Sequence, residues 1–366
     1  MTDRARSKVA VALSGGVDSS TAAALLVRQG YEVQGITARL WSGTEGPETV
    51  SGMPRSQRAI RSAERVCAAL GIPFQVVDLG QMFKEVVADY VFDSYARGET
   101  PNPCVVCNRR IKFGALWRIA QDLGADYLAT GHYARVRQQS GQYQLLRGAD
   151  SSKDQSYMLY LLDQPDLSRT LFPVGGYTKR EVRAMAQQMN LPTASQSESQ
   201  DLCFASDGDY RNLLEQHRPD AVRQGPIFDQ RGELVGHHGG IGFYTVGQRQ
   251  GLGLTWTEPL YVLEIDPSRN ALIVGPRSAG FASELIARQV HYISGHAPSN
   301  PGSITAKIRY QSRDARAVLI PVSAQIVRVI FDDPQFAITP GQSVVFYQDD
   351  VVLGGGVIAS ARLKEA

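Results

Sequence analysis

The sequence has few cysteines and no long hydrophobic run. Four cysteines in 366 residues are too few for a disulfide scaffold, and clustered cysteines in a reducing compartment usually serve catalysis or metal binding. The apolar run at residues 9–13 is shorter than the core of a signal peptide, and a membrane span needs about 18 apolar residues. We therefore expect a cytoplasmic protein with no membrane partner.

An excess of charge of one sign is also missing. The 38 basic and 36 acidic residues give a net charge of +2, so a nucleic acid would have to bind a local basic face rather than the chain as a whole. The length, with 43% hydrophobic residues, predicts two or three globular domains that bury full cores.

The first part of the chain alternates between strand and helix patterns. Strands are predicted at 9–13, 33–40, 74–79 and 127–130, and helices at 18–28, 58–70, 82–96 and 109–123. A polar stretch at 42–54 is predicted to be a loop. Strands separated by helices indicate an α/β domain with a parallel sheet, which binds ligands at the carboxyl ends of its strands.

The second part of the chain has a different pattern, beginning after about Asp209. Turns rich in Pro, Gly, Asp and Asn become frequent from Gly225 onward. Short strands are predicted between them at 261–265, 272–274, 304–310, 324–331 and 343–347. This spacing indicates an all-β region made of small barrels.

A glycine-rich loop, SGGVDSS at 14–20, joins the first predicted strand to the first helix. Glycines allow close backbone approach, hydroxyls donate hydrogen bonds, and a helix N-terminus favours anions. The loop lacks the Gly-Lys-Ser/Thr of a Walker A sequence. It resembles the pyrophosphate loop of the N-type ATP pyrophosphatases, which implies ATP cleavage to AMP and pyrophosphate, adenylation of an oxygen, and Mg²⁺ held by Asp18.

Two cysteines follow a predicted helix start. Asn102 is a good N-cap and Pro103 a good first residue, so Cys104 and Cys107 are expected on one face of the first turns. A helix N-terminus and the nearby basic residues 109, 110 and 112 would lower a thiol pKa, which predicts that Cys107 is a thiolate nucleophile. The alternative is half of a structural zinc site, although no second Cys-x-x-Cys or paired histidine motif is present.

The other two cysteines carry less local information. Cys67 lies with Val66 and Leu70 on the apolar side of a predicted helix, so we expect it in the core. Cys203 follows a polar turn and precedes an apolar pair. Taken alone, it fits a buried small hydrophobic residue at least as well as a functional thiol.

Several longer motifs extend the resemblance over nearly the whole chain. They are TPNPCVVCNRRIKFG, ATGHYAR, SKDQSYML, ESQDLCFA, GGIGFYTVGQRQGLG, KIRYQ, AITPGQSVVFY and LGGGVI. Together and in this order they resemble the tRNA-specific 2-thiouridylase family. The resemblance implies a pyrophosphatase domain at 1–210, a small central β domain at 211–287 and a tRNA-contacting β-barrel at 288–366.

The resemblance also implies a reaction and its residues. ATP adenylates the 2-oxygen of the wobble uridine, U34, in the tRNA anticodon stem-loop. Cys203 carries a persulfide, and Cys107 releases its sulfur or closes a disulfide with Cys203. Positions matching nucleotide contacts are Ala12, Leu13, Ser14, Gly15, Gly16, Val17, Asp18, Ser19, Ala38 and Gly131. Positions matching target-base or tRNA contacts are Asn102, Pro103, Cys104, His132, Lys153, Asp154, Gln155, Arg309, Tyr310 and Gln342. The expected partner besides tRNA is a persulfide-donating sulfur-relay protein or cysteine desulfurase.

Cys104 departs from the family pattern, because many members have Asp there. Cys104, Cys107 and Cys203 could instead hold a [4Fe-4S] cluster with one iron open to bind sulfide. Two more distant alternatives remain. Another ATP pyrophosphatase, such as an amide-forming ligase, would use the same loop without the cysteines, and a non-catalytic RNA-binding protein would use it to sense ATP.

Overall fold

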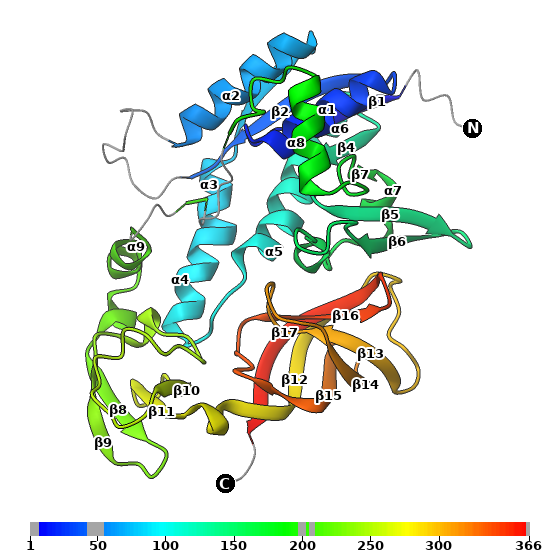
Figure 1. Ribbon diagram of the computed structural model, residues 1–366. Helices are drawn as coiled ribbons and strands as arrows, with labels where there is room; N and C mark the ends of the chain where they lie inside the picture. Colours follow the sequence, from blue (N-terminus) through cyan, green and yellow to red (C-terminus); the bar gives the residue numbers. More distant parts are fainter. Residues whose placement is uncertain (1–6, 42–54, 197–202, 205–208, 364–366) are drawn as a thin grey trace. The chain divides into compact units, whose positions relative to one another are not determined.

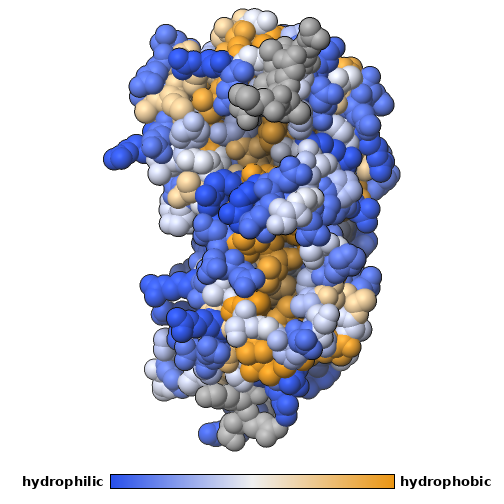
Figure 2. Space-filling model, turned by 90° about the vertical axis from the view of Figure 1, so that its right-hand side faces the viewer, coloured by the Kyte–Doolittle hydropathy of each residue, from blue (hydrophilic) through white to orange (hydrophobic). Residues whose placement is uncertain are grey.

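The computed structural model describes residues 7–41, 55–196, 203–204 and 209–363. The loop predicted at 42–54 lies outside these residues. The chain forms two compact units, which we describe separately: unit 1 comprises 1–86, 104–205 and 350–352, and unit 2 comprises 87–103, 206–349 and 353–366. Among the residues described, no helix is long and apolar enough to span a bilayer, and Figure 2 shows hydrophilic residues over much of one face.

Unit 1 is built on a five-stranded parallel sheet, shown in Figure 1. Its strands are β1 (Lys8–Ala12), β2 (Glu32–Arg39), β3 (Phe74–Asp78), β4 (Tyr127–Thr130) and β7 (Thr170–Leu171), in the order β3-β2-β1-β4-β7. Their pairings are all parallel. The middle of the central strand β1 is apolar and buried, because helices cover both faces of such a sheet. The prediction of a parallel α/β domain is confirmed.

Two helices that flank the first strands are also confirmed. They are α1 (Val17–Arg28) and α2 (Arg55–Leu70). Leu26 of α1 and Ala63 of α2 pack in one core cluster with the β1 side chains Val9 and Val11. Cys67 belongs to this cluster and is 1% exposed, so its prediction as a core residue is confirmed.

Two other predicted helices are interrupted. The segment predicted at 82–96 consists of α3 (Gly80–Phe83), a π-helix η2 (Lys84–Ala88) and α4 (Asp89–Ala96). The segment predicted at 109–123 consists of a π-helix η3 (Asn108–Leu116) and α6 (Trp117–Asp122), after a short α5 (Pro103–Cys107). A π-helix has a wider turn, which a search for a 3.6-residue period does not detect.

Unit 1 contains further elements that the sequence patterns did not indicate. They are the hairpin β5 (Ala134–Gln139) and β6 (Gln142–Arg147), the 3-10 turn η4 (Ser156–Met158), and the helices α7 (Gln164–Ser168) and α8 (Lys179–Gln188). Arg135 of β5 donates to Arg147 O and to Asp350, 2.7 and 3.0 Å away. Most residues of the hairpin are polar, so its apolar alternation is weak.

The first part of unit 2 is a small mixed sheet. Its strands are β8 (Gly225–Asp229), β9 (Leu234–His238), β10 (Leu260–Asp266) and β11 (Ala271–Pro276), in the order β10-β11-β8-β9. The helix α9 (Asp209–His217) and the 3-10 turns η5 (Pro219–Val222), η6 (Ile241–Phe243) and η7 (Arg277–Gly280) accompany them. Ile227, Val262 and Leu272 lie at the centre of its buried cluster.

The second part of unit 2 is a closed barrel of six strands. These are β12 (Phe281–Tyr292), β13 (Gly302–Lys307), β14 (Ala315–Ser323), β15 (Ile326–Phe336), β16 (Ser343–Gln348) and β17 (Val351–Leu363). They follow the order β12-β15-β14-β13-β16-β17, and antiparallel pairing of β12 with β17 closes the ring. Alternate inward side chains such as Leu285, Val329 and Phe346 fill it. The prediction of two β-rich parts after the α/β domain is confirmed.

Candidate active site

The loop between β1 and α1 is held against α2. Gly15 has φ +78°, and a Cβ added there would lie 2.6 Å from the carbonyl oxygen of Ala59. The hydroxyl of Ser62 donates to Gly15 O at 2.8 Å. A residue with a side chain would be strained in this conformation and would collide with α2. The glycine therefore fixes the loop backbone close to the helix.

Hydroxyl groups inside the loop tie it to the first turn of α1. The Ser14 N–H donates to Ser19 Oγ at 3.2 Å. Ser19 Oγ and Ser20 Oγ both donate to Gly16 O, at 3.2 and 2.8 Å. These bonds hold the loop in front of the positive end of the α1 dipole, where phosphate binds favourably.

The strands beside β1 bring two further predicted nucleotide positions toward the loop. A Cβ added to Gly131, directly after β4, would lie 2.5 Å from Ser19 N and 2.8 Å from Asp18 C. The end of β4 therefore contacts the start of α1, and nucleotide binding by Gly131 stays a prediction. Ala38 lies near the end of β2, the neighbour of β1 on the other side.

Asp18 lies in an ion pair that the sequence did not predict. Lys179 Nζ is 2.7 Å from both carboxylate oxygens of Asp18, and the Tyr133 hydroxyl donates to Asp18 Oδ1 at 2.8 Å. The side chains of Lys179 and Asp18 are 11% and 31% exposed. Sequence reasoning missed Lys179 because it lies far along the chain from the loop.

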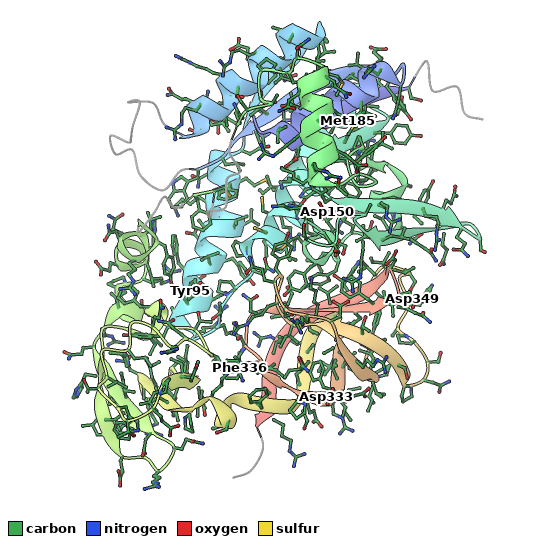
Figure 3. All side chains as sticks on the ribbon, viewed as in Figure 1. Tyr95, Asp150, Met185, Asp333, Phe336 and Asp349 are labelled. Atoms are coloured by element: carbon green, nitrogen blue, oxygen red, sulfur yellow. The ribbon has the colours of Figure 1, made fainter. Side chains whose placement is uncertain are left out.

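Lys179 is placed by the start of α8. Thr178 and Glu181 form a capping box, in which each residue's side chain bonds the other's backbone N–H. The backbone N–H of Lys179 donates to Asp150 Oδ2 at 2.9 Å, and Asp150 is labelled in Figure 3. The spacing of Thr178 and Glu181 is a sequence signal for a helix start, but it does not indicate Asp18 as the partner of Lys179.

The thiol of Cys107 is buried, and this contradicts one prediction. Burial raises its pKa to about 12, while Lys112 acts in the opposite direction. Cys107 is the last residue of the five-residue α5, so it is not in the first turn of a helix. Arg109, one of the basic residues expected to help, is instead paired with Asp163 and Asp166. The prediction of a lowered Cys107 pKa is therefore wrong.

The three candidate cysteines lie together in unit 1. The charges of Cys203 and Cys104 both raise the pKa of Cys107, so these thiols are close enough to interact. Cys104 and Cys203 are solvent-exposed. The Phe204 side chain is buried and contacts the rings of Trp41 and Phe83 at centroid distances of 6.3 and 5.8 Å, which anchors the chain beside Cys203.

The described residues contain no preformed site for a single metal ion. Within the described segments, no group of three or more His, Cys, Asp or Glu residues is arranged to hold a metal ion. Cys104, Cys107 and Cys203 all lie among the described residues. The [4Fe-4S] alternative on Cys104, Cys107 and Cys203 therefore stays a prediction, which iron and sulfide analysis can test.

His132 lies in a hydrogen-bonded chain near the thiols. Its Nδ1 is 2.7 Å from Thr130 Oγ1, and its Nε2 is 3.4 Å from Lys112 Nζ. Burial and then Lys112 hold the pKa of His132 well below its usual range. The imidazole is therefore neutral, so Lys112 donates to Nε2 and Nδ1–H donates to the threonine hydroxyl.

The loop with Lys153, Asp154 and Gln155 is tied to the protein. The Asp154 side chain is buried and accepts hydrogen bonds from Gly148 N and Ser156 N at 2.9 and 3.0 Å. Gln155 Oε1 accepts from Tyr133 N at 3.0 Å. Lys153 is partly exposed. The tRNA contacts expected of these residues stay predictions, and the carboxylate of Asp154 organises the loop itself.

The remaining predicted tRNA positions lie in unit 2. Arg309 Nη2 donates to Val246 O, Ala337 O and Thr339 Oγ1, at 2.7, 3.0 and 2.5 Å. It therefore joins the small sheet region to the barrel. Tyr310 lies beneath Lys307, with Nζ 6.0 Å from the ring centroid.

Asn102, Pro103 and Gln342 also belong to unit 2. Asn102 is 8% exposed. The Gln342 amide donates to Thr100 O and Pro101 O, at 3.1 and 3.0 Å. These bonds connect the barrel to the segment before α5.

Comparison with known proteins extends these observations to the whole chain. Residues 7–207 match the family described as tRNA methyl transferase HUP domain, 211–276 the PRC-barrel domain of the same name, and 282–358 the aminomethyltransferase beta-barrel domain. The chain is similar to a 4-thiouridine synthetase solved with RNA and ATP, at 20% identity over 58% of this chain and 51% of that one. The TM-score is 0.35, so this likeness carries no weight for function.

Curated relatives are much more similar. The tRNA-specific 2-thiouridylase MnmA of Roseiflexus castenholzii is 49% identical, and the match covers 96% of this chain and 99% of the relative. The enzyme of the same name from Moorella thermoacetica is 48% identical over the same shares. Identity at this level over nearly the whole of both chains shows the family. The chain belongs to the tRNA-specific 2-thiouridylase family.

Proposed function

We propose that this chain catalyses ATP-dependent 2-thiolation of the wobble uridine of tRNA. The observation that carries the proposal is the presence, within unit 1, of a phosphate-binding loop and of a thiol, Cys107, that lies close enough to Cys104 and Cys203 to interact with both. ATP cleavage alone would require only the loop. A second, sulfur-bearing centre in the same unit supports a tRNA-uridine 2-sulfurtransferase.

The first half-reaction uses the loop and its neighbours. The uracil 2-oxygen attacks the α-phosphate of ATP, and pyrophosphate leaves toward the amides of the loop and the start of α1. Asp18 has the oxygen ligands that Mg²⁺ prefers, although Lys179 occupies both of them here. Mg²⁺ bound with ATP would neutralise phosphate charge. Asp18 can bind this Mg²⁺ only if Lys179 releases one of the two Asp18 carboxylate oxygens. The ammonium group of Lys179 is then well placed to bind the phosphates of ATP.

The second half-reaction uses the cysteines. The outer sulfur of a Cys203 persulfide attacks C2 of the adenylated uracil, and AMP leaves with the former 2-oxygen. The thiolate of Cys107 then attacks Cys203 Sγ, the bond between the two sulfurs of the persulfide breaks, and its electron pair stays on the sulfur now attached to C2. The products are 2-thiouridine and a Cys107–Cys203 disulfide, which a thiol reductant must reduce before the next turnover.

The high pKa of the Cys107 thiol is compatible with this order of events. A thiol that stays protonated does not attack the persulfide prematurely, and only the small thiolate fraction reacts once the substrate is in place. Burial raises the pKa of both Cys107 and Cys104, and the charge of Lys112 opposes this rise, so Lys112 favours the reactive thiolate.

The substrate and partners follow from this chemistry. A uridine whose 2-oxygen must reach ATP and whose C2 must then meet the Cys203 persulfide has to be unstacked, and an anticodon loop presents such bases. The persulfide must come from a donor protein, for which we propose a sulfur-relay protein or a cysteine desulfurase. Since tRNA, ATP and thiol reductants meet in the cytoplasm, we propose that location.

Pyrophosphate release tests the proposal against its rivals. ATP mixed with a tRNA that carries U34 should yield pyrophosphate, and the same tRNA with C34 should not. An amide-forming ligase would keep its full activity after Cys107→Ser and Cys203→Ser. An ATP-sensing RNA-binding protein would release no pyrophosphate with any tRNA. Either result would refute the proposal.

A further inference from the structure

A turn of the barrel holds the segment that leads into the first cysteine helix. This turn, Thr339–Gln342, lies between β15 and β16. Gln342 Nε2 donates to Thr100 O at 3.1 Å and to Pro101 O at 3.0 Å. In return the Thr100 N–H donates to Pro340 O at 2.9 Å. Three hydrogen bonds therefore join the two segments, which lie about 240 residues apart in the chain.

The fit between them is also steric. Gly341 has φ +89°, and a Cβ added there would lie 2.8 Å from both Glu99 Cβ and Thr100 N. Any other residue would be strained in this conformation and would push the segment away from the turn. The contact therefore requires a glycine next to Gln342.

The turn is anchored rigidly in the barrel. Gly341 N donates to Ile358 O at 2.9 Å, and Ile358 N donates to Gln342 O at 2.8 Å. The held segment has two more ties within unit 2, from Thr100 Oγ1 to Thr245 Oγ1 at 3.2 Å and from Glu99 to Arg288. The barrel is thus a fixed support against which the segment is placed.

The segment has no regular structure of its own to place it. Residues 99–102 lie in neither helix nor strand, and Pro101 and Pro103 lack a backbone N–H. The chain then continues directly into α5, which carries Cys104 and Cys107. The position of Asn102 and Pro103, the expected target-base stretch, therefore depends on contacts made from outside.

We propose that Gln342, seated by Gly341, is a positioning residue for the target-base stretch Asn102–Pro103 and not primarily a tRNA contact. This inference deepens the proposed function. Gln342 acts through the carbonyl groups of Thr100 and Pro101. Without the Gln342 amide the stretch Asn102–Pro103 can shift its position. A shift of about 1 Å in a reacting group can lower the rate about a hundredfold.

The test compares Gln342→Met with Gln348→Met. Methionine keeps the length of the side chain but cannot donate a hydrogen bond. Gln348 lies at the exposed end of β16 and serves as a matched control. Hydrogen exchange of the peptide containing Thr100 and Asn102, the Kd for tRNA and the single-turnover thiolation rate are measured for each full-length protein.

For Gln342→Met we expect hydrogen exchange of the Thr100 N–H to rise about tenfold, because its hydrogen bond to Pro340 O opens more easily. The thiolation rate should fall about ten- to a hundredfold, while the Kd for tRNA stays within a factor of three of the control. Unchanged exchange would overturn the proposal. A weakened Kd that accounts for the whole loss of rate would also overturn it and would make Gln342 a direct tRNA contact.

Gly341→Ala provides a second variant that keeps the Gln342 amide. It should raise exchange in the same peptide and leave the exchange of barrel strand β14 unchanged. Equal exchange in the peptide would contradict the proposal. If the unmodified chain formed no 2-thiouridine, the proposed function would fail, whereas the exchange measurements would still decide whether the turn positions the segment.

Discussion

Lys179 Nζ lies 2.7 Å from each carboxylate oxygen of Asp18, the acidic residue of the phosphate-binding loop. The two residues are separated by 161 positions in the chain. The contact places a nearly buried cation at the start of α1. A positive charge there complements the phosphates of ATP, and it must share Asp18 with any Mg²⁺ that ATP brings.

The first prediction concerns this lysine. Lys179→Met should reduce tRNA-dependent pyrophosphate release at least about tenfold, because the phosphates lose a partner and the Asp18 carboxylate loses its counter-charge. Arg180→Met, on the exposed neighbouring position, should retain normal release. Normal release by Lys179→Met would show that the ion pair serves only to stabilise the fold.

The second prediction concerns thiol reactivity and pH. With the pKa of Cys107 raised to about 12, its alkylation rate should still rise about tenfold per pH unit between pH 7 and 10, since the thiolate is the reactive form. Lys112→Met should lower the rate at pH 9 about tenfold, equivalent to one pKa unit. Arg110→Met, which changes an exposed residue, is the control. The rates come from peptide mass spectrometry after treatment with a small alkylating reagent.

A plateau in the wild-type rate below pH 10 would contradict the raised pKa. Equal rates in Lys112→Met and Arg110→Met would show that Lys112 does not stabilise the thiolate. Both measurements use the folded protein without tRNA or ATP, so they do not depend on the proposed reaction.

The third prediction separates the sulfur-carrying mechanisms. Cys107→Ser and Cys203→Ser should each abolish thiolation, whereas Cys104→Asp should keep the rate within a few-fold, because a two-thiol relay does not use Cys104 as a carrier. A [4Fe-4S] cluster on three thiolates would be lost in all three variants. Iron and sulfide analysis after anaerobic purification should find no stoichiometric cluster. Iron-dependent thiolation that disappears in Cys104→Asp would refute the persulfide route.

The fourth prediction tests the packing behind Tyr133. A Cβ added to Gly175 would overlap the carbonyl group of Ala134, whereas one added to Gly176 would meet nothing within 4 Å. Gly175→Ala should therefore lower the free energy of unfolding by about 1–3 kcal/mol through overpacking. Gly176→Ala should change it by less than about 0.5 kcal/mol. Chemical denaturation measures both, and equal values would contradict the described packing.

Local patterns predicted much of the fold. The strand, loop and helix at 8–28 could be identified from residues that lie next to each other, because a buried strand, a glycine turn and an amphipathic helix each leave a local signature. The β-rich second part was recognised from its turns. The π-helical segments at 84–88 and 108–116 were missed, since their wider turn follows no short-range rule in the sequence.

The candidate site was predicted only in part, for a different reason. Asp18 and Cys107 were found as residue types in a pattern, but their environments depend on distant parts of the chain. Lys179 reaches Asp18 only through the sheet topology, and Cys107 is buried by tertiary packing that reverses the pKa shift expected from its neighbours. The hydrogen-bond partners of Gln342 could not be predicted from the sequence either, because the barrel and residues 100–101 meet only in the folded chain.

Mass spectrometry of the tRNA nucleosides tests the central claim most directly. The full chain is incubated with tRNA, ATP, Mg²⁺, a thiol reductant and a persulfide donor, and the nucleoside at position 34 is then isolated. The account predicts that sulfur replaces oxygen at C2 of uridine 34, that one AMP forms per sulfur, and that Cys203→Ser gives no sulfur. Formation of AMP while uridine 34 keeps its oxygen, in the wild-type protein with every donor tried, would contradict it.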